Sequence, residues 1–138
     1  MGRDEVILID THVAIWIATE TGSIGRQSKS LIESAAREER LLISAISFWE
    51  VALLVSKRRL SIGKTPSQLR EQLLDGGVTE LPVTGPIALL AVDLKELHGD
   101  PADRLIAATA VIQGATLMTA DADLLRWRHS IQRQDASK

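Results

Sequence analysis

The sequence predicts an α/β domain in which a mostly parallel central sheet carries helices on both faces. Three observations predict it. Short apolar runs alternate with longer segments that have helical spacing, which is typical of repeated βαβ units. The chain has 138 residues, 45% hydrophobic and 25% charged, as in ordinary soluble domains. It contains no cysteine, so no disulfide or thiolate metal site contributes. We therefore expect residues 1–138 to form a single domain.

The first part of the chain predicts a strand, a helix, a second helix and a second strand. Residues 5–9 form an apolar run bounded by charge, which indicates a buried strand. Residues 11–18 continue as a helix around Trp16, and residues 26–39 have apolar side chains at helical spacing. Residues 41–43 then form a short strand. The order of these elements already indicates a parallel sheet.

The middle of the chain predicts two helices followed by a third strand. Apolar residues from Phe48 to Val55 recur at helical spacing, and this helix ends in the basic run 57–59. Residues 61–66 are expected to form a loop. A helix is predicted to begin at Pro66 and to run to about Leu74, because Gly76 and Gly77 end it. Residues 78–81 are expected to form the next strand.

The last part of the chain predicts two long helices, a strand and a short helix. Pro86 starts a helix in which apolar residues as far as Leu97 share one face, and Gly99 closes it. Residues 102–113 form a strongly apolar helix, 115–118 a strand, and 124–125 part of a short helix. We expect residues 130–138 to be a weakly ordered tail.

Acidic residues stand at the ends of four apolar runs. Asp10 follows the first strand directly, and Asp121 lies three residues beyond the last one. Glu50 and Asp103 are expected in the first turns of their helices. In parallel sheets, ligands bind at the carboxyl ends of the strands, near the point where strand order reverses. The four carboxylates are therefore predicted to meet at that edge.

Helix capping explains each acid individually. Ser47 and Glu50 match a capping box, and Asp100 with Asp103 flanks a proline at the start of the next helix. Asp10 and Asp121 suit N-cap positions as well. If capping is their entire role, the chain is a non-catalytic α/β binding module with negligible metal affinity.

Electrostatics favours a metal site if the acids cluster. Four carboxylates within about 5 Å of one another repel by roughly 3 kcal/mol per pair at an effective dielectric constant near 20. A divalent cation removes this repulsion, and oxygen-only coordination suits Mg²⁺ or Mn²⁺. The chemistry that such a site implies is phosphodiester hydrolysis by metal-activated water.

Four segments resemble a known family. VILIDTHVAIW, ISFWEVALL, DPADRLIAATA and TADADLL, in this order, are similar to the motifs of PIN-domain ribonucleases, and more closely to the VapC-type toxins of VapBC toxin–antitoxin systems. The resemblance implies a PIN-like three-layer α/β/α sandwich and Mg²⁺- or Mn²⁺-dependent endonucleolytic cleavage of RNA. It also implies a cognate VapB-like antitoxin and a homodimer. The metal-binding and catalytic acids then become Asp10, Glu50, Asp103 and Asp121.

Several neighbouring residues have two possible roles. Thr11 and Thr119 flank the first and fourth acids, where a hydroxyl would orient a carboxylate or a metal-bound water. Asp100 is either a helix cap or a direct or water-mediated metal ligand, and Arg104 either meets substrate phosphate or is a surface or ion-paired residue. Asp123 is expected to be solvent-facing or capping.

The basic and aromatic residues indicate less about the substrate than the acidic residues do. Lys57, Arg58, Arg59 and Lys64 form either an RNA-facing patch or an ordinary solvated face, and the net charge is only −2. Three tryptophans, one phenylalanine and no tyrosine offer little base-stacking surface. RNA recognition is therefore expected to rest mainly on backbone shape and on contact between metal and phosphate.

Two other chemistries are weaker matches. A pair of imidazoles would support metal-free RNA cleavage, but His12, His98 and His129 have no recognisable spacing. Phosphoaspartate chemistry needs an acid two residues after Asp10 or a lysine near the last strand, and neither is present. The sequence has no long apolar segment and no signal peptide, so we expect a cytoplasmic protein without membrane association.

Overall fold

The computed structural model describes residues 5–97 and 99–138 and contains one five-stranded parallel sheet in the order β3-β2-β1-β4-β5. The strands are β1 (Ile7–Ile9), β2 (Leu41–Ser44), β3 (Val78–Leu81), β4 (Thr116–Thr119) and β5 (Arg133–Asp135). The helices are α1 (Thr11–Thr19), α2 (Arg26–Arg37), α3 (Ala45–Ser56), α4 (Pro66–Asp75), α5 (Gly85–Asp93), α6 (Pro101–Gln113) and α7 (Ala122–Arg126). Within the described ranges, no helix combines the length and apolar character that crossing a membrane requires.

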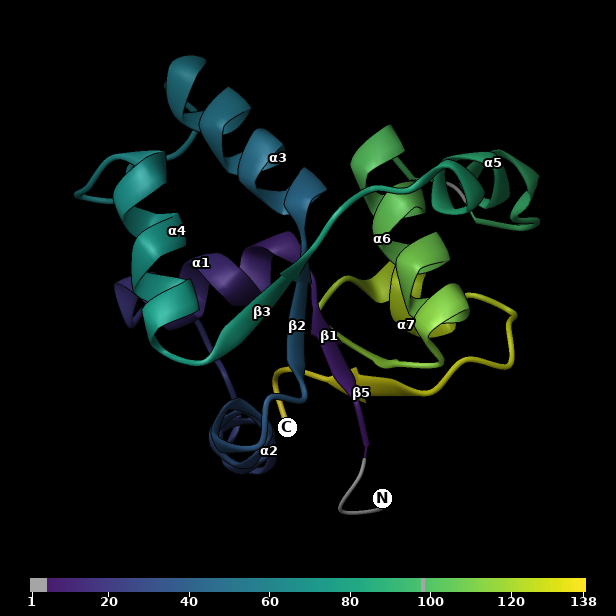
Figure 1. The fold of residues 1–138 in the computed structure, drawn as a ribbon, viewed down its shortest axis with the longest axis horizontal. Helices are drawn as coiled ribbons and strands as arrows, with labels where there is room; N and C mark the ends of the chain where they lie inside the picture. Colours follow the sequence, from purple (N-terminus) through teal and green to yellow (C-terminus); the bar gives the residue numbers. More distant parts are fainter. Residues whose placement is uncertain (1–4, 98) are drawn as a thin grey trace.

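Helices cover both faces of the sheet, as the sequence predicts. Figure 1 shows α1 to α4 on one side of the strands and α5 to α7 on the other. The side chains of β1 alternate between the two layers, because Ile7 and Ile9 belong to the apolar cluster beneath α1 and α4, whereas Leu8 belongs to the cluster beneath α5 and α6. All three are almost fully buried. The fold is the predicted three-layer sandwich.

The central position of β1 fixes the place of the site. This strand pairs in parallel with β2 on one side and with β4 on the other, so the strand order reverses there. The chain leaves β1 at Asp10, β2 at Ser44 and β4 at Thr119, all at the same carboxyl edge. Such a reversal separates the following helices and opens a crevice between them.

The C-terminal segment differs from the expected weakly ordered tail. Residues 133–135 form the edge strand β5, which pairs in parallel with β4, and the amide of Ala136 donates to the carbonyl of Thr119 at 2.9 Å. The carbonyl of Lys138 accepts from the amide of Gln27 at 3.0 Å, which ties the chain end to α2. The segment has no apolar pattern because backbone hydrogen bonds hold much of it and because its buried side chains include the polar Gln134 and the small Ala136.

The helix α5 also ends earlier than the apolar pattern predicts. It stops at Asp93, and Leu94 has an extended backbone conformation with φ −63° and ψ 125°. Leu94 and Leu97 are nevertheless buried in the same cluster as Ile87. The apolar spacing therefore reports correctly which residues are buried but overstates the length of the helix.

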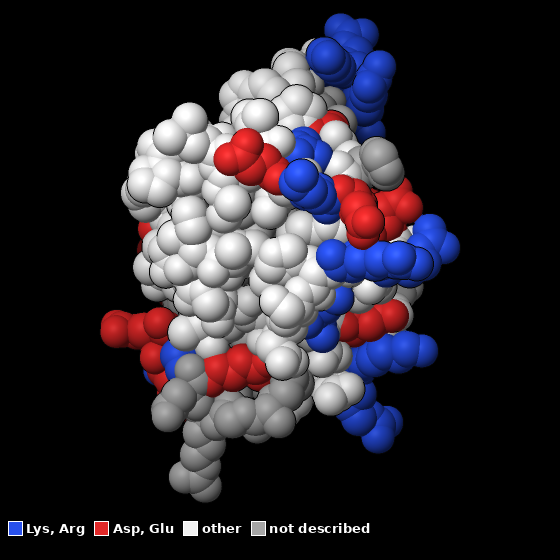
Figure 2. Space-filling model, turned by 90° about the vertical axis from the view of Figure 1, so that its right-hand side faces the viewer, with Lys and Arg blue, Asp and Glu red and all other residues white. Residues whose placement is uncertain are grey.

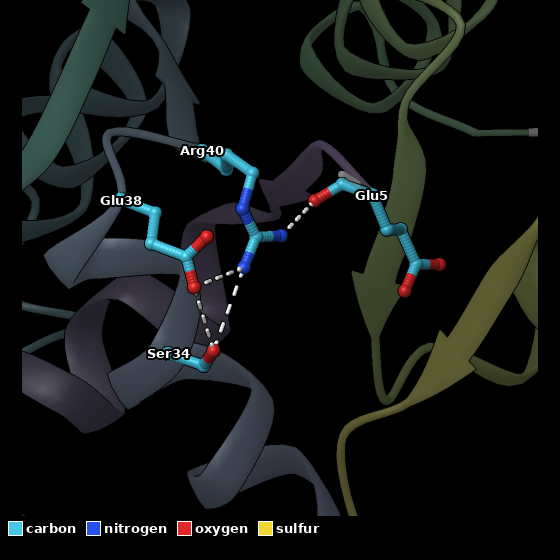
Figure 3. Close-up of polar contacts among 4 residues, drawn as sticks. All are labelled: Glu5, Ser34, Glu38 and Arg40. Carbon is cyan, nitrogen blue, oxygen red and sulfur yellow. Dashed lines mark hydrogen bonds and ion pairs between the residues drawn. The ribbon is translucent and has the colours of Figure 1, made fainter. Parts of the chain in front are cut away.

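A polar cluster anchors the opposite, amino-terminal edge of the sheet (Figure 3). Arg40 directly precedes β2, and its guanidinium donates to the backbone carbonyl of Glu5, which precedes β1. It also donates to Oγ of Ser34 at 3.5 Å and to Oε1 of Glu38 at 3.3 Å. The hydrogen bond and charge of Arg40 lower the pKa of the Glu38 carboxyl. This cluster joins β1 to α2 on the side of the sheet away from the acids.

Candidate metal centre

Five carboxylates line one cleft at the carboxyl edge of the sheet. The cleft has a volume of about 350 Å³ and also contacts Thr11, His12 and Trp16 of α1 and Ala120. Its acids are Asp10, Glu50, Asp100, Asp103 and Asp121. The four acids singled out in the sequence thus share one cleft, and Asp100 is a fifth member.

Asp10 is held rigidly between two elements. It is the N-cap of α1, where its Oδ1 accepts from the amide of Val13 at 3.0 Å. Its Oδ2 accepts a hydrogen bond from the hydroxyl of Thr119 at the end of β4. Burial raises the pKa of the Asp10 carboxyl, and the hydrogen bond from Thr119 partly opposes this shift. The carboxylate is therefore both a cap and a fixed wall of the cleft.

The hydroxyl of Thr119 connects two of the acids. It donates to Asp10 and accepts from the backbone amide of Asp121 at 3.0 Å. Asp121 is the N-cap of α7, and its Oδ1 accepts from the amides of Asp123 and Leu124 at 2.8 and 3.1 Å. One buried threonine therefore sets the positions of the first and fourth acids.

Glu50 is not in the first turn of its helix, contrary to the sequence prediction. The N-cap of α3 is Ser44, the last residue of β2, whose hydroxyl accepts from the amide of Ile46 at 3.2 Å. The capping box with Ser47 does not form, because the helix starts immediately after the strand. Ser47 is buried, and its hydroxyl instead accepts a hydrogen bond from Thr11 at 3.0 Å, which ties α1 to α3.

No helix cap accounts for the carboxylate of Glu50. Its Oε1 is buried and has no hydrogen-bond partner among residues 5–97 and 99–138. Burial is the main reason that the pKa of its carboxyl is raised; the hydroxyl of Thr11 partly opposes this shift, and the charge of Asp100 adds to it. A buried, unpartnered carboxylate oxygen facing other acids is unfavourable by itself and is suited to a cation.

Asp100 and Asp103 occupy the first turn of α6. Oδ1 of Asp100 accepts from the amide of Asp103 at 2.9 Å, which is the capping arrangement expected from the sequence. Burial, with the charges of Asp100 and Glu50, raises the pKa of Asp103 to about 7. Gly99 lies against Asp103, since a Cβ at this glycine would be 3.2 Å from the Cβ of Asp103.

The tightest group of ligand atoms is Glu50, Asp100 and Asp103. One carboxylate oxygen from each lies within 4.8 Å of the other two. This differs from the set expected from sequence, because Asp100 belongs to the compact group while Asp10 and Asp121 complete the cleft around it. The donors are all oxygen atoms, and Glu50 also has a buried oxygen without a hydrogen-bond partner among the described residues, so the residues present fit Mg²⁺ or Mn²⁺.

Arg104 does not face a substrate phosphate, nor does it form a surface ion pair. Its Nε and Nη atoms donate to four backbone carbonyls at and beyond the end of α5, those of Ala91, Val92, Leu94 and Leu97. The carbonyls at a helix C-terminus lack intrahelical donors, and the planar guanidinium satisfies several at once. This contact explains why α5 can end at Asp93.

The remaining candidates lie at the rim of the cleft or outside it. His12 is exposed and lines the cleft. His129 stacks on Trp127 with the ring centroids 4.4 Å apart, and His98 lies outside the described residues. Asp123 is exposed and pairs with Arg126 at 3.2 Å.

The basic candidates divide into two kinds. Residues 57–59 are exposed after α3 and show no ion pair among the contacts that the structure describes. Nζ of Lys64 donates to the carbonyl of Ala18 at 3.0 Å and to the side chain of Gln72. Lys64 therefore fixes a loop to α1, whereas the run 57–59 stays available to a polyanion.

Comparison with known proteins decides the family. Residues 7–129 match the sequence model of the PIN domain. The chain belongs to the PIN-domain family. It is also 36% identical over 124 residues to a protein named Ribonuclease VapC22 from Mycobacterium tuberculosis, covering 89% of this chain and 92% of that protein. The matched region of this PIN domain includes every acid of the cleft.

Solved structures share the fold at lower sequence identity. VapBC2 from Rickettsia felis, bound to a DNA fragment from its promoter, superposes with a TM-score of 0.67 and 19% identity, covering 94% of this chain and 97% of that chain. DNA-bound VapBC from Salmonella typhimurium gives a TM-score of 0.64 and 20% identity, covering 95% of this chain and 98% of that chain. These matches support the three-layer architecture of this PIN domain.

Replacing Asp103 by Asn should stabilise the metal-free protein at pH 8. The pKa of Asp103 is about 7 in the fold and roughly 4 in an unfolded chain, so the stability from this group is present below about pH 4 and is lost as the pH rises through 7. After allowance for solvent screening, we expect the substitution to raise the free energy of unfolding at pH 8 by about 1–2 kcal/mol. This corresponds to a rise in Tm of roughly 3–6 °C. Thermal unfolding in EDTA at pH 4.5 and pH 8 measures the difference.

Added Mg²⁺ should make the unmodified chain more thermally stable than Asp103→Asn, the reverse of their order without metal. The unmodified chain should gain thermal stability with Mg²⁺, whereas Asp103→Asn should gain little, because one ligand is missing. Asp123→Asn, an exposed acid outside the cleft, is the matched control and should behave like the unmodified chain. A lower Tm for metal-free Asp103→Asn at pH 8 would contradict the electrostatic strain assigned to this cleft.

Proposed function

We propose that this PIN domain is a VapC-type toxin of a type II toxin–antitoxin pair and hydrolyses RNA phosphodiester bonds with Mg²⁺ or Mn²⁺ in the acidic cleft. The observation that carries the proposal is the carboxylate of Glu50, which has a buried oxygen without a partner among the described residues and offers an oxygen within 4.8 Å of those of Asp100 and Asp103. The likeness to a protein named as a ribonuclease, over 89% of this chain, supports the reaction class.

The proposed ligands and their supports have distinct roles. Glu50, Asp100 and Asp103 would hold the cation, while Asp10 and Asp121 complete the negative wall around it. When bound, the cation supplies Lewis-acid stabilisation of phosphate charge and lowers the pKa of a water molecule. Asp103, whose pKa is about 7, is about half protonated near neutral pH and would have to be deprotonated to hold a cation. Thr119 keeps Asp10 and Asp121 from moving apart.

Capping alone leaves two of the five acids unexplained. Asp10, Asp100 and Asp121 each accept hydrogen bonds from backbone amides at a helix N-terminus. Glu50 and Asp103 cap no helix, yet both are partly buried with raised pKa values. Helix capping in a non-catalytic binding module does not require these two carboxylates, so the metal-dependent reaction accounts better for the site.

Phosphoaspartate chemistry is also less consistent with the geometry. His12 occupies the position two residues after Asp10, and no lysine lines the cleft. Both oxygens of Asp10 accept hydrogen bonds, from Val13 and from Thr119, which suits an orienting acid better than a nucleophile. We therefore retain hydrolysis by an activated water as the proposed reaction.

The proposed partners are a small VapB-like antitoxin and a second copy of the chain. Similar solved structures are those of VapBC bound to DNA, which supports an antitoxin partner. For the homodimer, α5 exposes Leu89 and Val92, at 73% and 78% of their surface. Figure 2, which views the side where Figure 1 places α5 to α7, shows a broad uncharged area with charges towards its edges. We propose that this face meets the second copy.

Cleavage of single-stranded RNA should depend on a divalent cation and on Glu50. EDTA should abolish cleavage and added Mg²⁺ or Mn²⁺ should restore it, since a cleft of carboxylates without a cation repels the phosphate and does not stabilise its developing charge. Glu50→Gln should reduce the rate by about 100-fold or more with an unchanged circular dichroism spectrum. Glu33→Gln, an acid that does not line the cleft, is the control. Cleavage that persists after exhaustive chelation would refute the proposal.

The oligomeric state should change when the apolar face of α5 is charged. Leu89→Asp with Val92→Asp should convert a dimer into a monomer, because two carboxylates would be buried at the contact. Light scattering after gel filtration measures the mass. Ser67→Asp, on the exposed surface of α4, is the control and should remain a dimer. A dimer that survives the double substitution places the contact elsewhere.

A further inference from the structure

A second cleft adjoins the acidic one. It has a volume of about 390 Å³ and lies between α1 and the loop of residues 60–63 that follows α3. His12 and Trp16 line both clefts. The two residues are four positions apart on α1 and therefore lie on the same face of the helix. A chain-like ligand in the acidic cleft can thus continue past them into the second cleft.

The walls of the second cleft suit the chemistry of a nucleobase. Buried Ile15 and Ile62 contribute apolar surface, as do the partly exposed Trp16 and Leu60. Hydroxyl groups are also present, and those of Thr19 and Thr21 lie 2.6 Å apart. A nucleobase has flat faces that stack on aromatic rings and a polar edge that hydrogen-bonds to hydroxyls.

The cleft is built in advance of any ligand. Nζ of Lys64 and Nε2 of Gln72 both donate to the carbonyl of Ala18, at 3.0 and 2.9 Å, which holds the loop and α4 against α1. Gly22, with φ +76°, packs against the indole of Trp16, and a Cβ there would be only 2.4 Å from the ring. A fixed aromatic ring loses little freedom when a base stacks on it.

Charge distinguishes this cleft from a third one that also contacts Trp16. The third cleft, of about 460 Å³ between α1 and α2, contains Glu20 and Glu33 against a single Lys29. The second cleft has no carboxylate in its lining, and its wall begins at Leu60, directly after the exposed basic run 57–59. A polyanion leaving the acidic cleft is therefore repelled from the third cleft and attracted towards the second.

We propose that the second cleft binds the nucleobase of a nucleotide next to the scissile phosphate, stacked on Trp16. This inference rests on the proposed cleavage of RNA and adds a base-binding subsite to it. The sequence offers few aromatic residues, but a single platform is sufficient for one base. The subsite would favour particular bases at one position relative to the cut, while the metal centre acts on any phosphate.

Filling the cleft tests the subsite. Ser61 is exposed and lines the cleft, so Ser61→Phe occupies the space of the base without disturbing the acids. Ser67→Phe places the same side chain on the exposed surface of α4, outside every cleft described above, and is the control. The substrate is a short RNA containing one mapped cleavage site, with an abasic nucleotide introduced in turn at each flanking position.

For the unmodified chain, we expect one flanking abasic position to raise KM roughly 10- to 100-fold, with kcat and Mg²⁺ dependence nearly unchanged. Ser61→Phe should show the raised KM on intact RNA and no further effect of the abasic nucleotide. Ultraviolet crosslinking of 4-thiouridine at that position should label Trp16 or residues 60–63.

The outcomes separate the subsite from the metal centre. Metal-dependent cleavage that is indifferent to Ser61→Phe and to every abasic position overturns the subsite alone. If Ser61→Phe leaves cleavage intact but prevents a co-expressed antitoxin from co-purifying, the cleft binds a peptide and the nucleobase subsite is wrong. Absence of any metal-dependent cleavage overturns the proposed function and this inference with it.

Discussion

Burial of carboxylates beside one another at one edge of a parallel sheet is the constraint around which this PIN domain is arranged. Strand order reverses at β1, so Asp10, Glu50, Asp103 and Asp121, far apart in sequence, line the same crevice. Backbone amides at helix N-termini stabilise three of the five acids. Burial still raises the pKa values of Asp10, Glu50 and Asp103, and the last two have no backbone amide of a helix N-terminus to offset it. A divalent cation would stabilise the charged carboxylates.

The surrounding cations are positioned so that they do not neutralise this cleft. Arg104 follows Asp103 directly, but its guanidinium is occupied by four carbonyls at and beyond the end of α5. Arg40 lies at the opposite edge of the sheet, where it joins β1 to α2. Among residues 5–97 and 99–138, the acids of the cleft form no ion pair with a lysine or arginine, so their negative potential remains available to a cation. The polar cluster around Arg40 and the acidic cleft therefore lie at opposite ends of the strands.

Much of this arrangement is readable from sequence, because periodicity and capping are local signals. The buried strands, most helix boundaries and the shared edge for the acids follow from apolar spacing and from residues such as Pro66 and Asp100. Long-range hydrogen bonds are not local, so the contact between Thr11 and Ser47 and the carbonyl network of Arg104 were missed. The strand β5 was missed because its Arg-Gln-Asp sequence has no apolar pattern. The sequence shows the role of Asp100 as a cap but not its proximity to Glu50, because that proximity is also long-range.

Anomalous diffraction from a crystal soaked with Mn²⁺ tests the central claim most directly, since it locates the cation without reference to activity. The account predicts a peak in the acidic cleft at roughly 2.0–2.3 Å from carboxylate oxygens of Glu50, Asp100 and Asp103. Further density towards Asp10 or Asp121 would identify additional ligands or a second ion. A map with no peak in this cleft at saturating Mn²⁺, and with the five carboxylates in the same positions, would contradict the claim that the cluster exists to hold a cation.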